Sequence, residues 1–181
     1  ISYFTDFINA RRRSPKDDLI SAFVDAQFEG VVLSDDEILA FSILLLVAGN
    51  ETTTNLIGNG ILALINNQDS FSSVKENFDL IPPMIEEILR FDSPVQGVVR
   101  IAKNDISLRG MDISTGEIVM AMIGAANHDH EQFENPESFD IHRLQNRHLS
   151  FGLGPHFCLG APLARLEARV LFKELFNRFS L

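Results

Sequence analysis

The sequence is poor in cysteine and in the larger aromatic residues, with one cysteine, no tryptophan and one tyrosine among 181 residues. A single cysteine excludes an internal disulfide framework and any zinc site built from several cysteines. Basic residues are also scarce, because 15 Lys and Arg stand against 25 Asp and Glu and leave a formal net charge of −10. Nucleic acid is therefore not expected as the main partner, since phosphate binding needs a basic surface.

Long hydrophobic runs are missing as well. The longest, from Ile38 to Gly49, covers 12 residues and is interrupted only by Ser42, whereas a membrane-spanning helix needs about 20. The segment Ile1 to Phe4 reads as neither a signal peptide nor a spanning helix, so no membrane anchor is expected. With 45% hydrophobic residues the chain is not disordered, and its length fits one domain or a piece of a larger one.

Helical patterns dominate what is present. Ser34 and Glu37 form a capping box at the start of a helix that is apolar almost all round, which predicts burial on most of its sides. An earlier helix is expected to begin near Pro15 and to close at Glu29 and Gly30. The predicted helices lie within residues 1–30, from about Ser34 to Asn66, from Pro82 to Phe91 and from Leu159 to Phe179.

Short β elements and one long loop are expected between the last two helices. The predicted strands are Val98–Ile101, Ile106–Leu108 and Glu117–Ile123. The polar stretch Asn127–Asn146 reads as an irregular loop, and loops this long in a compact domain are usually functional. The expected fold class is therefore mainly α with small β-sheet elements.

The single cysteine lies in a distinctive segment, FGLGPHFCLG at residues 151–160. Gly152 and Gly154 permit a tight bend, and Cys158 then precedes a helix that has Pro162 in its first turn. Backbone N–H groups and the positive helix end would favour the thiolate form of this cysteine. Such a residue can be a nucleophile, a redox sensor or a metal ligand, while the simplest alternative is a small buried hydrophobe.

Two further clusters combine acidic residues with other polar side chains. Residues 48–54 read AGNETTT inside the long apolar helix, where Glu51 beside Thr52 makes a short proton path. The alternative is an exposed glutamate beside threonines whose hydroxyls bond back to helix carbonyls. Glu87 and Arg90 stand at i,i+3 on a helix, which by itself is a common surface ion pair.

In their order these segments resemble one family. Residues 151–160 match, at every fixed position, the haem-binding signature F-G-x-G-x-H-x-C-x-G of the cytochrome P-450 family, and residues 161–167 look like its soluble bacterial members. Residues 48–54 are similar to the family's A-G-x-[D/E]-T-T motif, and Glu87 with Arg90 to its E-x-x-R pair. The resemblance implies that residues 1–181 are the C-terminal haem-thiolate portion of a larger single domain whose N-terminal part is absent.

The resemblance also implies roles for individual residues. Cys158 would be the axial ligand of the iron of haem b, Thr52 would position dioxygen and its water, and Glu51 would help to deliver protons. Arg143 would complete a structural triad with Glu87 and Arg90. The other cofactor-binding positions implied are Arg100 and His156, for the haem propionates, and Ala48, Phe151, Gly152, Gly160 and Ala164. The substrate-facing positions implied are Leu46, Val47, Asn50, Val95, Val98 and Val99.

The implied parent reaction is monooxygenation of a small, hydrophobic organic substrate by O2, with NAD(P)H electrons arriving through a ferredoxin- or flavodoxin-like partner in the cytoplasm. Residues 141–181 carry six basic and two acidic side chains, a net charge of +4, so the rest of the chain carries −14. The redox partner is therefore expected at the basic side around Cys158. The alternatives are a truncated or vestigial haem-binding or interaction module without catalysis, and a haem-free thiol redox sensor.

Overall fold

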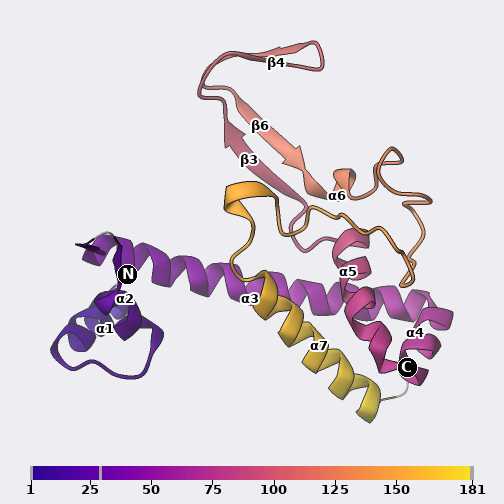
Figure 1. Cartoon of the computed structure of the whole chain (residues 1–181), viewed down its shortest axis with the longest axis horizontal. Coiled ribbons are helices and arrows are strands. Elements are labelled where there is room, and N and C mark those ends of the chain that lie inside the picture. The colour runs from indigo at the N-terminus through magenta and orange to yellow at the C-terminus, as the bar shows by residue number, and fades with distance from the viewer. Residues whose placement is uncertain (1, 29, 180–181) are drawn as a thin grey trace. The chain divides into compact units, whose positions relative to one another are not determined.

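The computed structural model describes residues 2–28 and 30–179, in which short antiparallel strand pairs accompany a larger number of helices (Figure 1). The helices are α1 (Ser2–Arg13), α2 (Leu19–Asp25), α3 (Asp35–Asn66), α4 (Gln68–Glu76), α5 (Ile81–Phe91), α6 (Ile123–Ala126) and α7 (Ala161–Arg178), with 3-10 turns at Phe78–Leu80 and Gly154–His156. The strands are β1 (Gln27–Phe28), β2 (Val31–Val32), β3 (Gly97–Ile101), β4 (Ile106–Leu108), β5 (Met111–Ile113) and β6 (Ile118–Met122). Strand β1 pairs with β2, β3 with β6 and β4 with β5. The predicted class, mainly α with small β-sheet elements, is confirmed.

The chain divides into two compact units, and the first ends at Glu51. In this unit Asp18 caps α2 by accepting a hydrogen bond from the Ser21 amide at 2.9 Å, and it also pairs with Arg11 of α1. These bonds, the one to the Ser21 amide foremost, lower the pKa of Asp18. Helix α2 ends at Asp25, so the predicted end at residues 29 and 30 is wrong.

The reason for that earlier end is a hairpin. Gly30 has a positive φ of 83° and lies between β1 and β2, so the glycine serves a strand turn instead of closing a helix. Glu29, which the sequence assigned to the helix end, lies outside the described residues. The next predicted start is confirmed, because Ser34 N–H donates to Glu37 Oε2 at 2.8 Å and Glu37 N–H donates to Ser34 Oγ at 3.3 Å.

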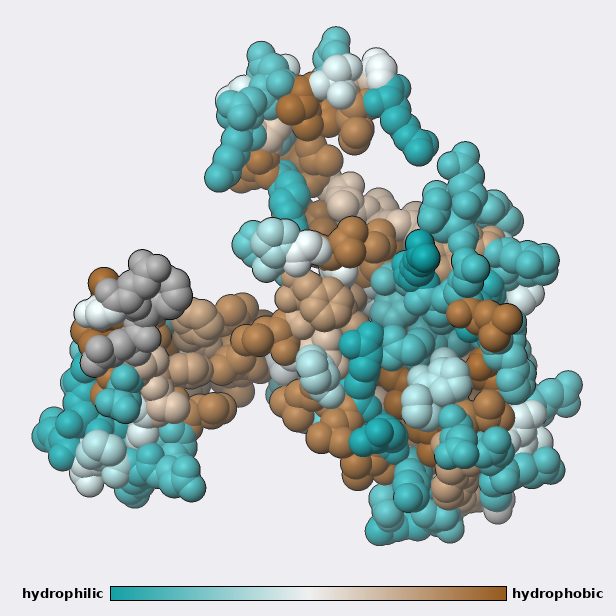
Figure 2. Space-filling model, viewed as in Figure 1, coloured by the Kyte–Doolittle hydropathy of each residue, from teal (hydrophilic) through white to brown (hydrophobic). Residues whose placement is uncertain are grey.

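Helix α3 is as long as its apolar pattern predicts, but the expectation of burial on most sides is wrong for its first-unit part. Ile38 is buried there, whereas Leu44, Leu46 and Val47 are 57%, 59% and 62% exposed. An apolar pattern that runs all round a helix shows that every side suits burial, and the described chain covers only one of them. The resulting apolar surface of α3 is the brown stretch along this helix in Figure 2.

The second unit, residues 52–181, has its core between α5 and α7. Its centre is formed by fully buried residues of both helices, among them Ile85 and Ile88 of α5 and Phe172 of α7. Gly60 of α3 permits close packing here, because a Cβ at this position would lie 2.6 Å from the Phe172 ring and 2.7 Å from Ile88. This packing fixes α5, which carries two of the predicted site residues.

Helices α4 and α6 and strand β5 of the second unit were not predicted. Helix α4 buries only Phe71 and Val74, too few apolar residues to give a helical pattern in an otherwise polar segment. Strand β5 pairs with β4 in a hairpin whose apolar residues are exposed among hydrophilic ones (Figure 2). No helix in the described part of the chain is both long and apolar enough to cross a membrane.

Candidate functional site

The cysteine loop, residues 151–160, is shaped by two glycines and by hydrogen bonds within its own backbone. Gly152 and Gly154 have φ values of 73° and 76°, a conformation that side chains other than glycine rarely adopt. Cys158 N–H donates to the Phe151 carbonyl at 2.9 Å, and Phe157 N–H donates to the Gly154 carbonyl at 3.0 Å. The loop therefore folds back on itself and holds Cys158 shortly before the start of α7.

The sulfur of Cys158 is open to its surroundings. Cys158 is exposed, so the alternative of a buried hydrophobic cysteine is wrong. A Cβ on Gly160 would lie 3.8 Å from Cys158 Sγ, at ordinary van der Waals distance, so Gly160 lies beside the sulfur and places no side chain there. Leu153, Phe157 and Leu159 of the same loop also expose apolar side chains. One accessible sulfur with apolar neighbours and no side chain at Gly160 fits a flat prosthetic group that carries its own metal.

No three His, Cys, Asp or Glu side chains gather to hold a bare metal ion among residues 2–28 and 30–179. The donor set that Cys158 offers is therefore a single sulfur. Helix α7 begins with Ala161 and Pro162, so its positive end lies just after the cysteine. Ala161 N–H donates to the Cys158 carbonyl at 3.3 Å, which ties the loop to the first turn of the helix.

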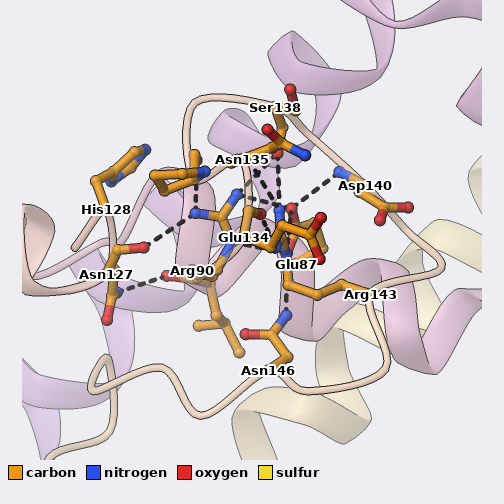
Figure 3. A network of polar contacts seen from close by, with 12 residues as sticks. Glu87, Arg90, Asn127, His128, Glu134, Asn135, Ser138, Asp140, Arg143 and Asn146 are labelled. Carbon is orange, nitrogen blue, oxygen red and sulfur yellow. Dashed lines mark hydrogen bonds and ion pairs between the residues drawn. The ribbon is translucent and has the colours of Figure 1, made fainter. Parts of the chain in front are cut away.

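The structure brings together the three residues predicted as a structural triad. Glu87 and Arg90 of α5 are completely buried, and Arg90 donates to both carboxylate oxygens of Glu87 at 2.8 and 2.9 Å. Arg143 Nε lies 3.2 Å from Glu87 Oε2. Asn146 Nδ2 and Asp140 N–H also donate to this carboxylate, at 3.0 and 2.9 Å (Figure 3). We call Glu87, Arg90, Arg143 and Asn146 the Glu87 cluster.

The Glu87 cluster holds the predicted long loop, residues 127–146, against α5. Beyond its bonds to Glu87, Arg90 donates to the carbonyls of Asn127 at 3.0 Å, Pro136 at 2.8 Å and Ser138 at 2.9 Å. Figure 3 shows two of these acceptors, Asn127 and Ser138, on separate stretches of the loop. A buried charge pair of this kind loses the hydration of both ions, and the added hydrogen bonds offset that loss.

Sequence reasoning missed a buried asparagine that joins the long loop to the cysteine loop. Asn127 is fully buried, donates to Ser150 Oγ at 3.0 Å and accepts from Leu149 N–H at 2.8 Å. Ser150 Oγ in turn donates to the Leu89 carbonyl of α5 at 2.6 Å. The residues just before Phe151 are thereby fixed to the end of α5. The burial of Asn127 depends on packing that no local sequence pattern encodes.

A second acidic cluster that sequence reasoning missed lies beside the cysteine loop. Glu86 of α5 accepts from Arg165 of α7 at 2.7 and 2.8 Å, one bond to each carboxylate oxygen. His148 Nε2 lies 3.1 Å from Glu86 Oε2, and the Arg165 guanidinium stands 4.5 Å from the centre of the Phe151 ring. We call Glu86, Arg165, His148 and Phe151 the Glu86 cluster.

The charges of the Glu86 cluster reinforce one another. Burial would raise the pKa of Glu86, but hydrogen bonds from Arg165 and His148 outweigh it and lower this pKa to about 2. The hydrogen bond with Glu86 raises the pKa of Arg165, burial opposes that rise, and the charges of Glu86 and of Cys158 add to it. Arginine is charged at any ordinary pH, and the charge of Arg165 acts most strongly on Glu86 and least on Cys158.

The other predicted site residues lie on several elements. Arg100 is exposed on β3, where its guanidinium donates to the Val99 carbonyl at 2.9 Å, and His156 is exposed in the 3-10 turn of the cysteine loop. Gly152 shapes the cysteine loop, and Ala164 is half-buried in α7. In the first unit, Leu46, Val47, Ala48, Asn50 and Glu51 are exposed; in the second, Val99 is exposed and Thr52, Val95 and Val98 are half-buried. The roles of these residues stay predictions.

Comparison with known proteins identifies the class and then the family. The fold and the cysteine loop define a mainly α-helical protein that presents one exposed cysteine on a glycine-bent loop. The family profile named Cytochrome P450 matches residues 2–81 and 76–181, which together cover nearly the whole chain. The chain belongs to the cytochrome P450 family.

Individual relatives agree with this assignment. The chain is 45% identical over 175 residues to cytochrome P450 109 of Bacillus spizizenii, covering 97% of this chain and 43% of the relative. It is 47% identical over 178 residues to the polyketide biosynthesis cytochrome P450 PksS of Bacillus subtilis, covering 98% of this chain and 44% of PksS. The sequence is 50% identical to that of CYP109E1 from Bacillus megaterium, whose crystal structure in complex with testosterone matches with a TM-score of 0.94. The match covers 98% of this chain and 49% of CYP109E1. The chain thus spans less than half the length of these relatives.

Proposed function

We propose that this chain is the C-terminal haem-thiolate portion of a cytochrome P450 monooxygenase and that Cys158 is the axial ligand of the haem iron. The observation that carries the proposal is the exposed sulfur of Cys158, left open at Gly160 on a loop that folds back on itself. When haem b is bound, it supplies the oxygen-activating chemistry, which thiolate ligation favours by donating electron density.

The chain's own residues would hold the haem and keep the loop in place. Phe151, Gly152, Gly160 and Ala164 would contact it near the sulfur. A guanidinium suits a carboxylate through paired hydrogen bonds, so Arg100 would bind a haem propionate, with His156 as a second donor. The Glu87 cluster supports this arrangement indirectly, because it fixes the long loop on α5.

Proton delivery is assigned to α3. The Thr52 hydroxyl would hold a water molecule by hydrogen bonding, and the Glu51 carboxylate would pass protons towards it. Glu51 is exposed and Thr52 half-buried, so the first can exchange protons with solvent. A Thr52→Ala variant of the full-length parent is expected to divert NAD(P)H electrons to peroxide, while unchanged coupling to product would contradict this role.

The parent reaction would insert one atom of O2 into a C–H or C=C bond and release the other as water, consuming two electrons and two protons. The predicted substrate-facing residues Leu46, Val47, Val95, Val98 and Val99 are apolar, which favours a small hydrophobic substrate. The testosterone complex of CYP109E1 supports this substrate class, because testosterone is a largely apolar molecule.

The ion pairs refine where a ferredoxin- or flavodoxin-like donor would bind. Of the six basic residues in 141–181, Arg143 pairs with Glu87, Arg165 with Glu86 and Arg178 with Glu174. The described residues supply no ion pair to Arg147, Arg169 and Lys173, and all three are exposed. We therefore assign the attraction for an acidic donor to these three side chains.

The test is to express the 181-residue chain, add haem, reduce it and add carbon monoxide. The strongly red-shifted Soret band of thiolate-ligated carbonyl haem is expected for the wild-type chain and for Glu174→Gln, a control on the exposed side of α7. Cys158→Ala should lose the band. An unchanged spectrum in Cys158→Ala would overturn the assignment of the ligand.

The exposure of Cys158 also suits a haem-free thiol redox sensor. That function predicts no haem spectrum and reversible oxidation of Cys158 by peroxide. The same carbon monoxide experiment separates the two functions, since only the haem-thiolate site gives the red-shifted band.

A further inference from the structure

Adjacent glutamates on α5 serve different neighbours. Successive residues on an α-helix point about 100° apart, so Glu86 and Glu87 cannot face the same side. Glu87 is completely buried and holds the long loop, as Figure 3 shows. Glu86 is only partly buried and faces Arg165 of α7 and His148. Glu86 therefore belongs to a separate set of contacts, which leads to the cysteine loop.

The geometry of this connection is specific. Arg165 gives one hydrogen bond to each oxygen of Glu86, the paired arrangement that fixes a guanidinium plane. The guanidinium carbon lies 4.5 Å from the centre of the Phe151 ring, well inside the range of a cation–π contact of about 6 Å. The Phe151 carbonyl in turn accepts the Cys158 amide hydrogen bond at 2.9 Å.

His148 adds a third contact, because its two ring nitrogens have separate partners. Its Nδ1 accepts the Ser150 N–H at 3.2 Å, so the proton of the neutral ring is assigned to Nε2, which donates to Glu86 Oε2 at 3.1 Å. The Ser150 backbone is thus connected to Glu86 through His148, while Arg165 contacts the Phe151 ring. Each of the three contacts limits how far the start of the cysteine loop can move.

We propose that Glu86 and Arg165 are positioning residues for the cysteine loop: Glu86 holds the Arg165 guanidinium over Phe151, where its fixed positive charge favours the reduced state of a haem bound to Cys158. The inference rests on the proposed haem-thiolate function. The physical reason is that reduction adds negative charge at the iron and its sulfur ligand, and a nearby cation stabilises that charge. Because the Glu86 and Arg165 side chains are only 30% and 36% exposed, solvent screens this charge less than at the open surface.

Reduction of the haem-loaded 181-residue chain tests the charge. At a fixed solution potential we expect the ratio of ferrous to ferric haem in Arg165→Gln to fall about three- to tenfold, the range for one partly screened charge. Arg165→Lys, which keeps the charge without the paired bonds, should lie between Arg165→Gln and wild type. The matched control is Arg178→Gln on the same helix, where the pair with Glu174 is 70% and 52% exposed. An Arg165→Gln ratio equal to that of Arg178→Gln would overturn the proposal.

Amide hydrogen exchange of the haem-free chain tests the positioning separately. Exchange at the Cys158 amide should accelerate several-fold in Glu86→Gln and in Arg165→Gln, and stay unchanged in Glu174→Gln. Thermal unfolding of each variant shows whether the chain still folds, and Glu86→Gln keeps the side-chain volume in case Arg165→Gln does not. Unchanged exchange in both variants would contradict the positioning role.

The two proposals fail in different ways. If the wild-type chain shows no thiolate spectrum with haem, the proposed function fails and the charge effect with it, while amide exchange still decides the positioning role. If the thiolate spectrum is present in every variant and the ferrous to ferric ratio does not change, only the further inference is overturned.

Discussion

Replacing Glu87 by glutamine removes one charge from the most enclosed ion cluster of the second unit. The wild-type carboxylate accepts two hydrogen bonds from Arg90, one each from Asp140 N–H and Asn146 Nδ2, and a further contact from Arg143. Glutamine preserves the shape, but its amide group places N–H donors against guanidinium donors. Both arginines would then lack an opposing charge, and Arg90 is completely buried.

The expected loss of unfolding free energy in Glu87→Gln is about 3–5 kcal/mol, the cost of removing one partner of a buried ion pair. The free energy of unfolding of an ordinary domain is about 5–15 kcal/mol, so this substitution would remove a large part of the chain's stability. For a chain of this size the melting temperature should fall by about 6–20 °C, since each kcal/mol corresponds to about 2–4 °C. Urea unfolding followed by circular dichroism at neutral pH measures this loss directly.

The matched comparison is Glu174→Gln, which breaks an exposed i,i+4 pair with Arg178 on α7. Such pairs contribute about 0.3–0.5 kcal/mol, so this variant should unfold almost like the wild type. If Glu87→Gln lost no more than Glu174→Gln, the Glu87 cluster would not stabilise the fold and the reasoning would be refuted.

Two other predictions concern packing and pH. Gly60→Ala should lower the unfolding free energy by about 1–3 kcal/mol because its methyl group would overlap the Phe172 ring. Gly58→Ala is the control, because a Cβ at Gly58 meets nothing within 4 Å. Equal losses of unfolding free energy in the two variants would contradict the close packing at Gly60. The pKa of Glu86 is about 2 in the folded chain against an ordinary 4.5, so its stabilisation is present above pH 4.5 and is lost as the pH falls towards 2. Glu86→Gln should therefore flatten the pH dependence of urea unfolding over that interval, and an unaltered slope would argue against the pairing with Arg165.

Features that depend on neighbouring residues were predictable from the sequence. The capping box of Ser34 and Glu37 formed as expected, because three residues of separation place the two side chains together at any helix start. The bend of the cysteine loop also followed from its glycines, since Gly152 and Gly154 adopt positive φ angles. In both places the information lies within a few residues.

Features that depend on distant residues were not derivable in this way. Arg143 is 56 positions from Glu87, and only the family resemblance linked them before the structure placed them in contact. Glu86 and Arg165 are 79 positions apart. Glu86 stands beside the Glu87 and Arg90 pair and Arg165 lies within residues 161–167, but no local pattern links these two side chains to each other. The burial of Asn127 likewise depends on packing between its loop and α5, which no local pattern encodes.

The pattern of α3 shows a different limit. Its apolar residues predict what each face of the helix prefers, but burial also requires a partner for that face. Ile38 and Leu56 are buried, while Leu44 and Leu46 are exposed in the described chain. Length and helix type were therefore predictable, whereas the extent of burial was not.

The central claim is that Cys158 binds the haem iron through its sulfur. X-ray absorption at the iron edge of the haem-loaded chain tests this most directly, because it detects the atoms bonded to the metal. We predict one sulfur neighbour of the iron in the wild-type chain and none in Cys158→Ala. A wild-type spectrum with only nitrogen and oxygen neighbours would contradict the claim.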